Sequence, residues 1–166
     1  RSLGSSASFS YRVHADPTSL VPHPNPFGLQ GTPARVPPNS PFAPTVVPPN
    51  LITLQNLPFS RSDAWLAPSE TRLNGNNISA FADLAAPDGR SDGDQEVLLS
   101  DPFEFDYVYD FGQAPGASPS QRDASVTTSY YVLNFLHDWF YDAGWDENSR
   151  NPQAFKYGRG GEDGDA

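Results

Sequence analysis

Four carboxylates stand close together in a glycine-rich loop, and they are the first residues in this sequence whose spacing suggests chemistry. Asp88, Asp92, Asp94 and Glu96 lie within residues 87–96, where two glycines permit tight turns. Carboxylate oxygens are the ligands that calcium prefers, and calcium takes six to eight of them. The spacing differs from that of an EF-hand loop. These residues therefore predict either a calcium site or a solvated acidic turn.

The three histidines do not form a recognisable metal motif. A zinc site needs at least three converging protein ligands, and this chain has no cysteine to add to them. His14 falls on the polar side of an alternating stretch, so we expect it at the surface. His23 lies among prolines, and we assign it no role. No zinc site is predicted within these residues.

His137 and Asp138 form the one His–Asp pair in an apolar setting. Adjacent residues on a helix point about 100° apart, so we expect no direct pairing between the two side chains. A catalytic histidine is one reading. We favour a neutral core histidine that is hydrogen-bonded to backbone, shares its helix face with Asn134, and lies on the side of Tyr130, Leu133 and Phe140.

Apolar residues at spacings of three and four predict one long helix over about 122–143. Ser118 or Ser120 can cap its start, Asp123 suits its first turn, and Gly144 ends it. Aromatic and aliphatic side chains surround much of this helix. A helix that is apolar on several faces is buried against more than one layer, so we expect a partner layer outside this sequence.

Strands are predicted where apolar and polar residues alternate. Residues 8–15 form an opening strand, shorter strands or irregular structure follow in 51–73, and a dense turn at 72–77 leads into a strand at 78–84. Residues 102–111 alternate most regularly and place a stripe of aromatic residues, 103–111, on one face. This stripe is interpreted as a sheet face packed on the body, with a carbohydrate-binding platform as the alternative.

Eleven prolines in residues 16–50 exclude helix there and predict an extended strap over the folded body, or alternatively a disordered linker. We divide the chain into an opening strand (1–15), a strap with short strands (16–70), and a unit with the β-arm, acidic loop, aromatic strand, helix and glycine-rich loop (71–166). The fold class is α+β.

Charge is distributed unevenly along the chain. The net charge is −10, with +2 in the first 80 residues and −12 in the remainder. The acidic half lacks a basic stripe, so nucleic acid is not an expected partner. No apolar run approaches the 18 residues of a membrane span. The chain starts without Met or an apolar leader and stops in a glycine-rich loop, so we expect a processed fragment of a longer secreted precursor.

Residues 123–147 resemble a helix of the fungalysin family of secreted zinc metallopeptidases. The matching positions are Asn134, His137, Asp138, Tyr141, Gly144 and Glu147. The family pattern continues with Gly-Asn-Phe-Gln, where this chain has Arg150, Asn151, Pro152 and Gln153, and then with a glycine-rich stretch similar to 158–166. Upstream, residues 73–84 resemble the family's Gly-Asn-Asn segment, and 11–15 resemble the strand that opens its catalytic domain.

The resemblance implies the β-rich half of a thermolysin-like fold, including its first long helix. In the family, zinc is held by a His-Glu-x-x-His helix and a downstream Glu, and the motif Glu activates the zinc-bound water that hydrolyses a peptide bond. That motif is absent here. We therefore expect it on a second chain or on the C-terminal half of the same precursor, with proteins or peptides as substrates.

Two functions from different classes follow from these observations. The first is the N-terminal chain of a secreted, processed zinc metalloendopeptidase, with zinc bound elsewhere and calcium as a candidate second metal. The alternative is a non-catalytic secreted β-rich module that binds sugar or protein through the aromatic stripe at 103–111. The two are discriminated by whether a His-Glu-x-x-His helix accompanies this chain.

Overall fold

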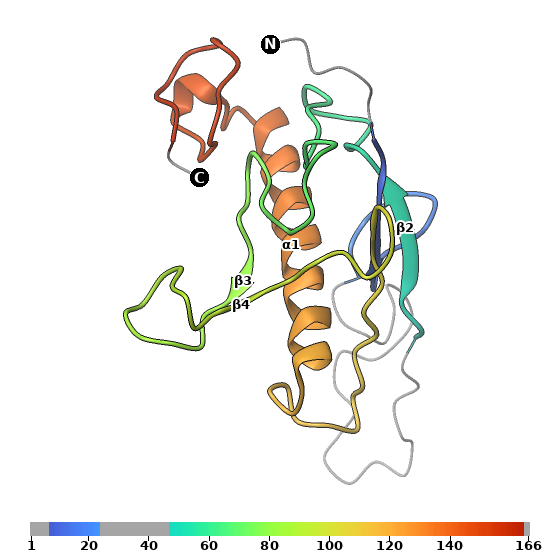
Figure 1. Ribbon diagram of the computed structural model, residues 1–166. Coiled ribbons are helices and arrows are strands. Elements are labelled where there is room, and N and C mark those ends of the chain that lie inside the picture. Colours follow the sequence, from blue (N-terminus) through green and yellow to red (C-terminus); the bar gives the residue numbers. More distant parts are fainter. Residues whose placement is uncertain (1–6, 24–46, 165–166) are drawn as a thin grey trace, which may run out of the picture.

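The computed structural model describes residues 7–23 and 47–164, which form a mixed α+β fold (Figure 1). Three short strands make one sheet in the order β2-β1-β5, and their bounds are Phe9–Val13 (β1), Asn50–Leu54 (β2) and Glu104–Phe105 (β5). β1 pairs antiparallel with β2 and parallel with β5. Most of the 16–50 strap falls in 24–46, outside the described residues, and 16–23 contain a turn in which Asp16 accepts backbone hydrogen bonds.

A second, smaller sheet and one long helix complete the fold. β3 (Phe81–Ala82) pairs antiparallel with β4 (Gln95–Glu96), and α1 (Pro119–Asp142) is followed by a 3₁₀ turn, η1 (Glu147–Ser149). Figure 1 shows α1 running lengthwise beside the β1–β2 pair. None of the helices in the described ranges combines the length and apolar character needed to cross a membrane.

The opening strand is confirmed, and it supplies the centre of the core. Phe9, Tyr11 and Val13 are buried on the side of β1 that faces α1. The Tyr11 ring stacks on Phe105 at 5.7 Å and on Tyr130 at 5.9 Å between ring centroids. We call the set that meets here the aromatic core: Phe9, Tyr11, Trp65, Phe105, Tyr130 and Tyr131. Aromatic pairs at such distances add to the stabilisation from buried area.

The helix begins earlier than the periodicity predicts. Ser118 is the N-cap, its hydroxyl accepts from the Gln121 backbone N–H at 3.2 Å, and Pro119 takes the first helical position, where its missing N–H costs nothing. Asp123 consequently falls beyond the first turn, and its carboxylate accepts from Gln95 instead. Gly144 follows the helix with a φ of 101°, which confirms the predicted end.

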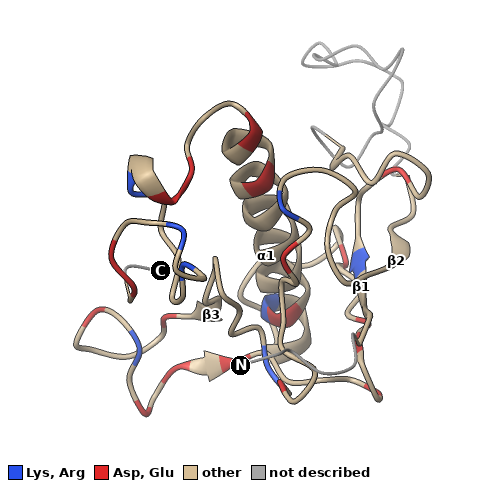
Figure 2. Ribbon diagram, turned by 90° about the horizontal axis from the view of Figure 1, so that it is seen from above, with Lys and Arg blue, Asp and Glu red and all other residues tan. Residues whose placement is uncertain are grey.

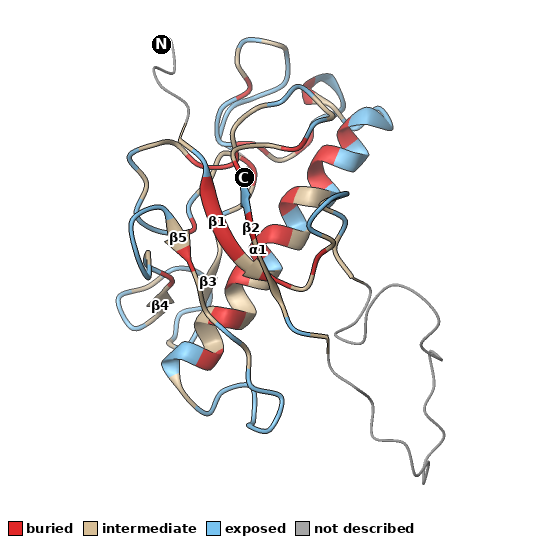
Figure 3. Cartoon of the chain, turned by 90° about the vertical axis from the view of Figure 1, so that its right-hand side faces the viewer, coloured by how far each residue is buried: buried red, intermediate tan, exposed pale blue. Residues whose placement is uncertain are grey.

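Within the described residues α1 is covered on one side only, and the layer expected to cover its other faces lies outside this sequence, so burial on several faces stays a prediction. Figure 3 shows the buried residues of α1 on the side toward the sheet and exposed residues on the opposite side. The exposed residues include large apolar ones that the sequence pattern had placed in a core: Leu133, Leu136, Trp139 and Phe140. We call these four the outer face of α1. Among the described residues, nothing covers it.

The long aromatic strand predicted over 102–111 was also wrong. Only Glu104 and Phe105 pair as strand, because Phe103 has a left-handed φ of 61° and Glu104 N donates to Asp101 O in a tight turn. Phe105 is fully buried, whereas Phe103 is 45% exposed. The aromatic stripe therefore does not form one continuous face. The predicted strand at 78–84 is likewise reduced to β3, although a bridge between Asn74 and Ser79 confirms the turn before it.

Candidate functional site

The most unusual region of the molecule is a set of buried polar side chains between α1 and residues 146–164, which we call the 146–164 segment. Eight polar or charged residues there are almost inaccessible to solvent, and we call them the polar cluster: Asn77, Asn134, His137, Asp138, Glu147, Asn151, Gln153 and Lys156. Polar groups are buried at a cost unless they are hydrogen-bonded. Their concentration in one place therefore marks the region as a candidate functional site.

Local structure explains how these residues meet. Asn134, His137, Asp138 and Tyr141 are spaced by three and four residues and so share the inner face of α1. After the helix, the Asp146 side chain caps η1 by accepting from Ser149 N. Arg150 then adopts a left-handed conformation, with a φ of 60°, at the position where the resembling family pattern has glycine. This bend directs Asn151 inward.

His137 is buried, as predicted, but its partners differ from the prediction. Its Nδ1 lies 3.1 Å from Asp138 Oδ1, so the two adjacent side chains do pair. Its Nε2 lies 3.3 Å from the side-chain amide nitrogen of Asn151. A carboxylate only accepts and an amide nitrogen only donates, so this arrangement suits a neutral ring that carries its proton on Nδ1. Of the three residues expected beside it, Tyr130 is buried on the inner face, whereas Leu133 and Phe140 lie on the outer face.

Three amides form a second part of the polar cluster. Asn77 donates to Asn134 Oδ1 at 3.3 Å and accepts from Gln153 at 3.4 Å. The adjacent Asn76 accepts from the backbone N–H groups of Ala154 and Phe155. Gly75 opens this turn, and a Cβ there would collide with the Trp65 carbonyl and the Tyr130 hydroxyl. The asparagine-rich turn therefore holds the 146–164 segment against α1.

Hydrogen bonds to Glu147 and Asp63 form the part of the region beside the end of α1. The Tyr141 hydroxyl donates to Glu147 Oε2 at 2.6 Å, and Arg159 makes a bidentate pair with Asp63 at 2.5 and 2.9 Å. The hydrogen bond to Asp63 is the largest cause that raises the pKa of Arg159. Burial, followed by the bond to Glu147, raises the pKa of Tyr141. These contacts fasten the 146–164 segment to the loop that carries Trp65.

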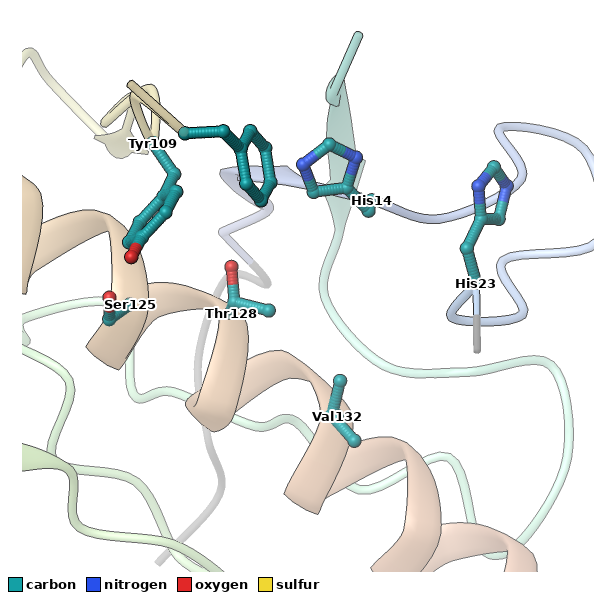
Figure 4. Close-up of a pocket in the computed structure, with 7 residues that line it drawn as sticks. His14, His23, Tyr109, Ser125, Thr128 and Val132 are labelled. Atoms are coloured by element: carbon teal, nitrogen blue, oxygen red, sulfur yellow. The ribbon is translucent and has the colours of Figure 1, made fainter. Parts of the chain in front are cut away.

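A cavity of about 410 Å³ lies at the other end of α1 (Figure 4), lined by His14, His23, Tyr109, Phe111, Ser125, Thr128 and Val132. His14 is half-buried with its ring in the wall of this cavity, so it is less exposed than the predicted surface position. Neither ring nitrogen of His14 has a hydrogen-bond partner of normal geometry among the described residues, although the Val47 backbone is near. Burial, and then the neighbouring His23, lowers the pKa of His14.

Two carboxylates of the acidic loop, those of Asp94 and Glu96, bond to groups within or beside the loop. Asp94 accepts from the backbone N–H groups of Leu84, Ala85 and Ser91, and these bonds lower its pKa. Glu96 faces Arg90 at 3.3 Å. Asp88 and Asp92 are exposed. Figure 2 shows acidic residues spread over several loops. The four carboxylates are not gathered into a metal site among the described residues, so calcium binding at Asp88, Asp92, Asp94 and Glu96 stays a prediction that requires the loop to rearrange.

The residues present do not fit a zinc site. Within residues 7–23 and 47–164, no three His, Asp or Glu side chains are arranged so that they could hold a metal ion. His137 uses both ring nitrogens within the polar cluster, and His14 and His23 line the cavity without a third ligand. The polar cluster is also buried from solvent. Its chemistry is therefore to hold the 146–164 segment in place.

The sequence pointed to part of the polar cluster only. The spacing of Asn134 and His137 placed both on one face, but Asn77, Asn151 and Gln153 carried no signal of their own because they lie in turns. The resemblance to the family was a useful signal, because these five residues all occupy positions that match the family pattern. Lys156, buried with its Nζ donating to Asn151 O, was missed entirely.

Comparison with known proteins agrees with the resemblance seen in the sequence. The profile of the fungalysin metallopeptidase (M36) family matches residues 45–166. Extracellular metalloproteinase 5 of Trichophyton tonsurans is 32% identical over 117 residues, which cover 68% of this chain and 17% of that relative. The protein of the same name from Trichophyton rubrum is 33% identical over 122 residues, with the same coverage. Extracellular metalloproteinase 1 of Trichophyton equinum is 34% identical over 107 residues, or 61% of this chain and 16% of the relative.

The chain thus spans about 17% of the length of the first curated relatives that it matches. No solved structure matches it. The family match covers the acidic loop, α1, the polar cluster and the 146–164 segment. The chain belongs to the fungalysin metallopeptidase (M36) family.

Proposed function

We propose that this chain is part of a secreted zinc metalloendopeptidase, in which it forms the β-containing part and first long helix of a thermolysin-like catalytic domain. The observation that carries the proposal is the family match over residues 45–166. The curated relatives are named extracellular metalloproteinases, which supports secretion and a protein or peptide substrate. Release of the active form from a longer precursor belongs to the same proposal.

The chain's contribution is structural in this proposal. Zinc would supply the water activation needed for peptide hydrolysis, and its ligands would lie in the part of the protein outside these residues. The polar cluster and the aromatic core hold α1 from two sides, and so fix the helix that the remainder of the enzyme packs against. No side chain described here is assigned a catalytic step.

The apolar outer face of α1 supports the proposal that a further layer of protein packs on this helix. Leu133, Leu136, Trp139 and Phe140 are all at least 36% exposed, and together they form an apolar surface on one side of the helix. Exposed apolar patches of this kind mark interaction sites. We propose that this surface packs against the rest of a longer polypeptide, or against a second chain derived from it, because the matching relatives extend far beyond the matched region.

An endopeptidase assay on the whole gene product tests the function. We expect cleavage of a denatured protein substrate that is abolished by a zinc-selective chelator and restored by zinc. Chelator-resistant cleavage would contradict a zinc enzyme. A complete gene product that lacks a His-Glu-x-x-His helix and has no peptidase activity would contradict the whole proposal.

A pair of leucine variants tests the partner layer. Leu133 and Leu84 are 46% and 54% exposed, and only Leu133 lies on the outer face of α1. In the whole protein, Leu133→Ser should lower the free energy of unfolding by about 1–3 kcal/mol, because burying a leucine side chain contributes that much. Leu84→Ser should change it by less than about 0.5 kcal/mol. Equal effects of the two variants would contradict packing on the outer face.

Calcium binding by the acidic loop is a separate prediction. If Asp88, Asp92, Asp94 and Glu96 bind calcium in the folded state only, a hundredfold excess over the dissociation constant stabilises the fold by roughly 3 kcal/mol. Asp94 would then exchange backbone donors for the cation. Thermal unfolding with calcium and with a calcium-selective chelator provides the measurement. Equal midpoints would reduce the loop to a solvated turn.

A further inference from the structure

One titratable ring joins α1 to the 146–164 segment inside the polar cluster. His137 Nε2 faces the side-chain amide nitrogen of Asn151 at 3.3 Å, and Asn151 is fully buried. The backbone of Asn151 is itself held, since its N–H donates to Asp146 O and its carbonyl accepts from Lys156. A change at His137 is therefore transmitted directly to the segment.

The direction of that effect follows from the hydrogen-bond roles. An imidazole nitrogen accepts from an amide N–H only while it carries no proton. A proton on Nε2 would leave two donors facing each other, and the contact with Asn151 would be lost. The other nitrogen would be little affected, because Nδ1 already donates to Asp138 at 3.1 Å.

We propose that His137 makes the docking of the 146–164 segment on α1 sensitive to protons, so that the neutral ring holds Asn151 and the protonated ring releases it. A proton on Nε2 and the hydrogen bond from Asn151 exclude each other, because both need the same lone pair of the ring nitrogen. Because such coupling is reciprocal, a proton on Nε2 must weaken the docking.

The other charged groups around the ring do not account for such a switch. The charged and titratable residues that face the region include Asp138 and Tyr141 on α1, Glu147 on η1, Lys156 and Arg159 on the segment, and Arg61 and Asp63 on the loop packed against them. Carboxylates, lysine and arginine ordinarily keep their charge between pH 5 and 7.5, and imidazole is the side chain that changes. His14 and His23 line the cavity at the other end of α1, apart from this contact.

Hydrogen exchange measured by mass spectrometry on the whole protein tests the proposal independently of peptidase activity. Exchange rates are compared at pH 7.5 and pH 5 after correction for the intrinsic pH dependence of exchange. Peptides from 146–164 should exchange about 3- to 10-fold faster at pH 5, the size expected when one hydrogen bond is lost. Peptides from β1 serve as the internal reference and should change less.

Two variants separate His137 from other causes. His137→Gln removes the titrating group, so the difference between the two pH values should disappear in the 146–164 peptides. Asn151→Asp replaces the donor with an acceptor, so the sign should reverse and pH 5 should slow exchange relative to pH 7.5.

Three results would overturn the proposal. Unchanged corrected exchange in the wild type would show that protonation and docking are not coupled. The same acceleration in His137→Gln would assign the effect to other groups. Slower exchange of the wild type at pH 5 would mean that the Asn151 amide turns, and that its Oδ1, which has no hydrogen-bond partner among the described residues, accepts from the charged ring.

Discussion

The two sides of α1's inner face are held by different chemistry. Toward β1, the helix meets the aromatic core, in which rings stack and almost no charge is present. Toward the 146–164 segment, it meets the polar cluster, while apolar residues of that segment such as Phe155 point to solvent. Apolar burial is non-directional and tolerant, whereas a buried polar cluster is stable only when each group finds its partner. The first contact therefore supplies stability, and the second supplies a defined position that depends on conditions.

The sharpest test of this contrast is the removal of one phenylalanine from each region. Phe105 is fully buried in the aromatic core, and Phe155 is 52% exposed on the 146–164 segment. Phe105→Ala should cost about 3–5 kcal/mol, because it removes a large side chain and leaves a cavity. Phe155→Ala should cost less than about 1 kcal/mol. Urea unfolding of the whole protein, with hydrogen exchange of β1 peptides, provides the measurement, and similar costs would refute the division.

Replacing His137 probes the polar side. His137→Ala should destabilise the protein by about 1–3 kcal/mol, since it leaves a cavity and deprives Asp138 and Asn151 of partners. In the proposed zinc peptidase, turnover per folded, zinc-loaded molecule should change little, because the ring is buried and both its nitrogens are occupied. Active-site titration together with thermal unfolding checks both quantities. A loss of about 10³-fold in turnover with unchanged stability would assign His137 a catalytic role.

The cavity lined by His14 predicts a pH dependence of the free energy of unfolding. The pKa of His14 is lowered in the folded state, so the unfolded chain binds its proton first as the pH falls below the ordinary histidine value of about 6.5. Stability should therefore decrease from pH 6.5 downward until His14 also becomes protonated in the folded state. Unfolding free energies of the wild type and His14→Gln, measured from pH 7.5 to 5, should differ in slope. Parallel curves would show that His14 contributes nothing to this dependence.

The smallest expected effect is at the bend that leads into the polar cluster. Arg150 is exposed and holds a φ of 60°, a conformation that costs a residue with a Cβ about 1–2 kcal/mol and costs glycine much less. Arg150→Gly should thus stabilise the docked segment, by about 0.5–1 kcal/mol after the extra entropy of glycine in the unfolded chain is deducted. Slower hydrogen exchange of 146–164 is the expected readout. Faster exchange would indicate that the arginine side chain contributes a contact of its own.

Sequence reasoning succeeded where a local rule determined the outcome. Ser118, Gly144 and the alternation of β1 each specify their structure through neighbouring atoms. Gly144 and β1 were predicted, and Ser118 was one of two predicted caps. Sequence reasoning failed where contacts with residues distant in the chain determine the structure. Two contacts override the alternation at 102–111. One is the turn at Phe103, and the other is the hydrogen bond that Arg12 Nε donates to Asp106 Oδ1 at 2.7 Å. The polar cluster gathers residues from 77 to 156, and that convergence is not a local property.

The central place of β1 in its sheet also has a consequence for the time course of folding. β1 lies between a strand that starts at residue 50 and one that starts at residue 104, and it packs on a helix that starts at residue 119. Almost all of its contacts are thus made with residues synthesised much later. At about 5–20 residues per second, the ribosome needs roughly 5–20 seconds to supply them. Throughout that interval Phe9, Tyr11 and Val13 lack their native cover, so β1 is open to capture by chaperones.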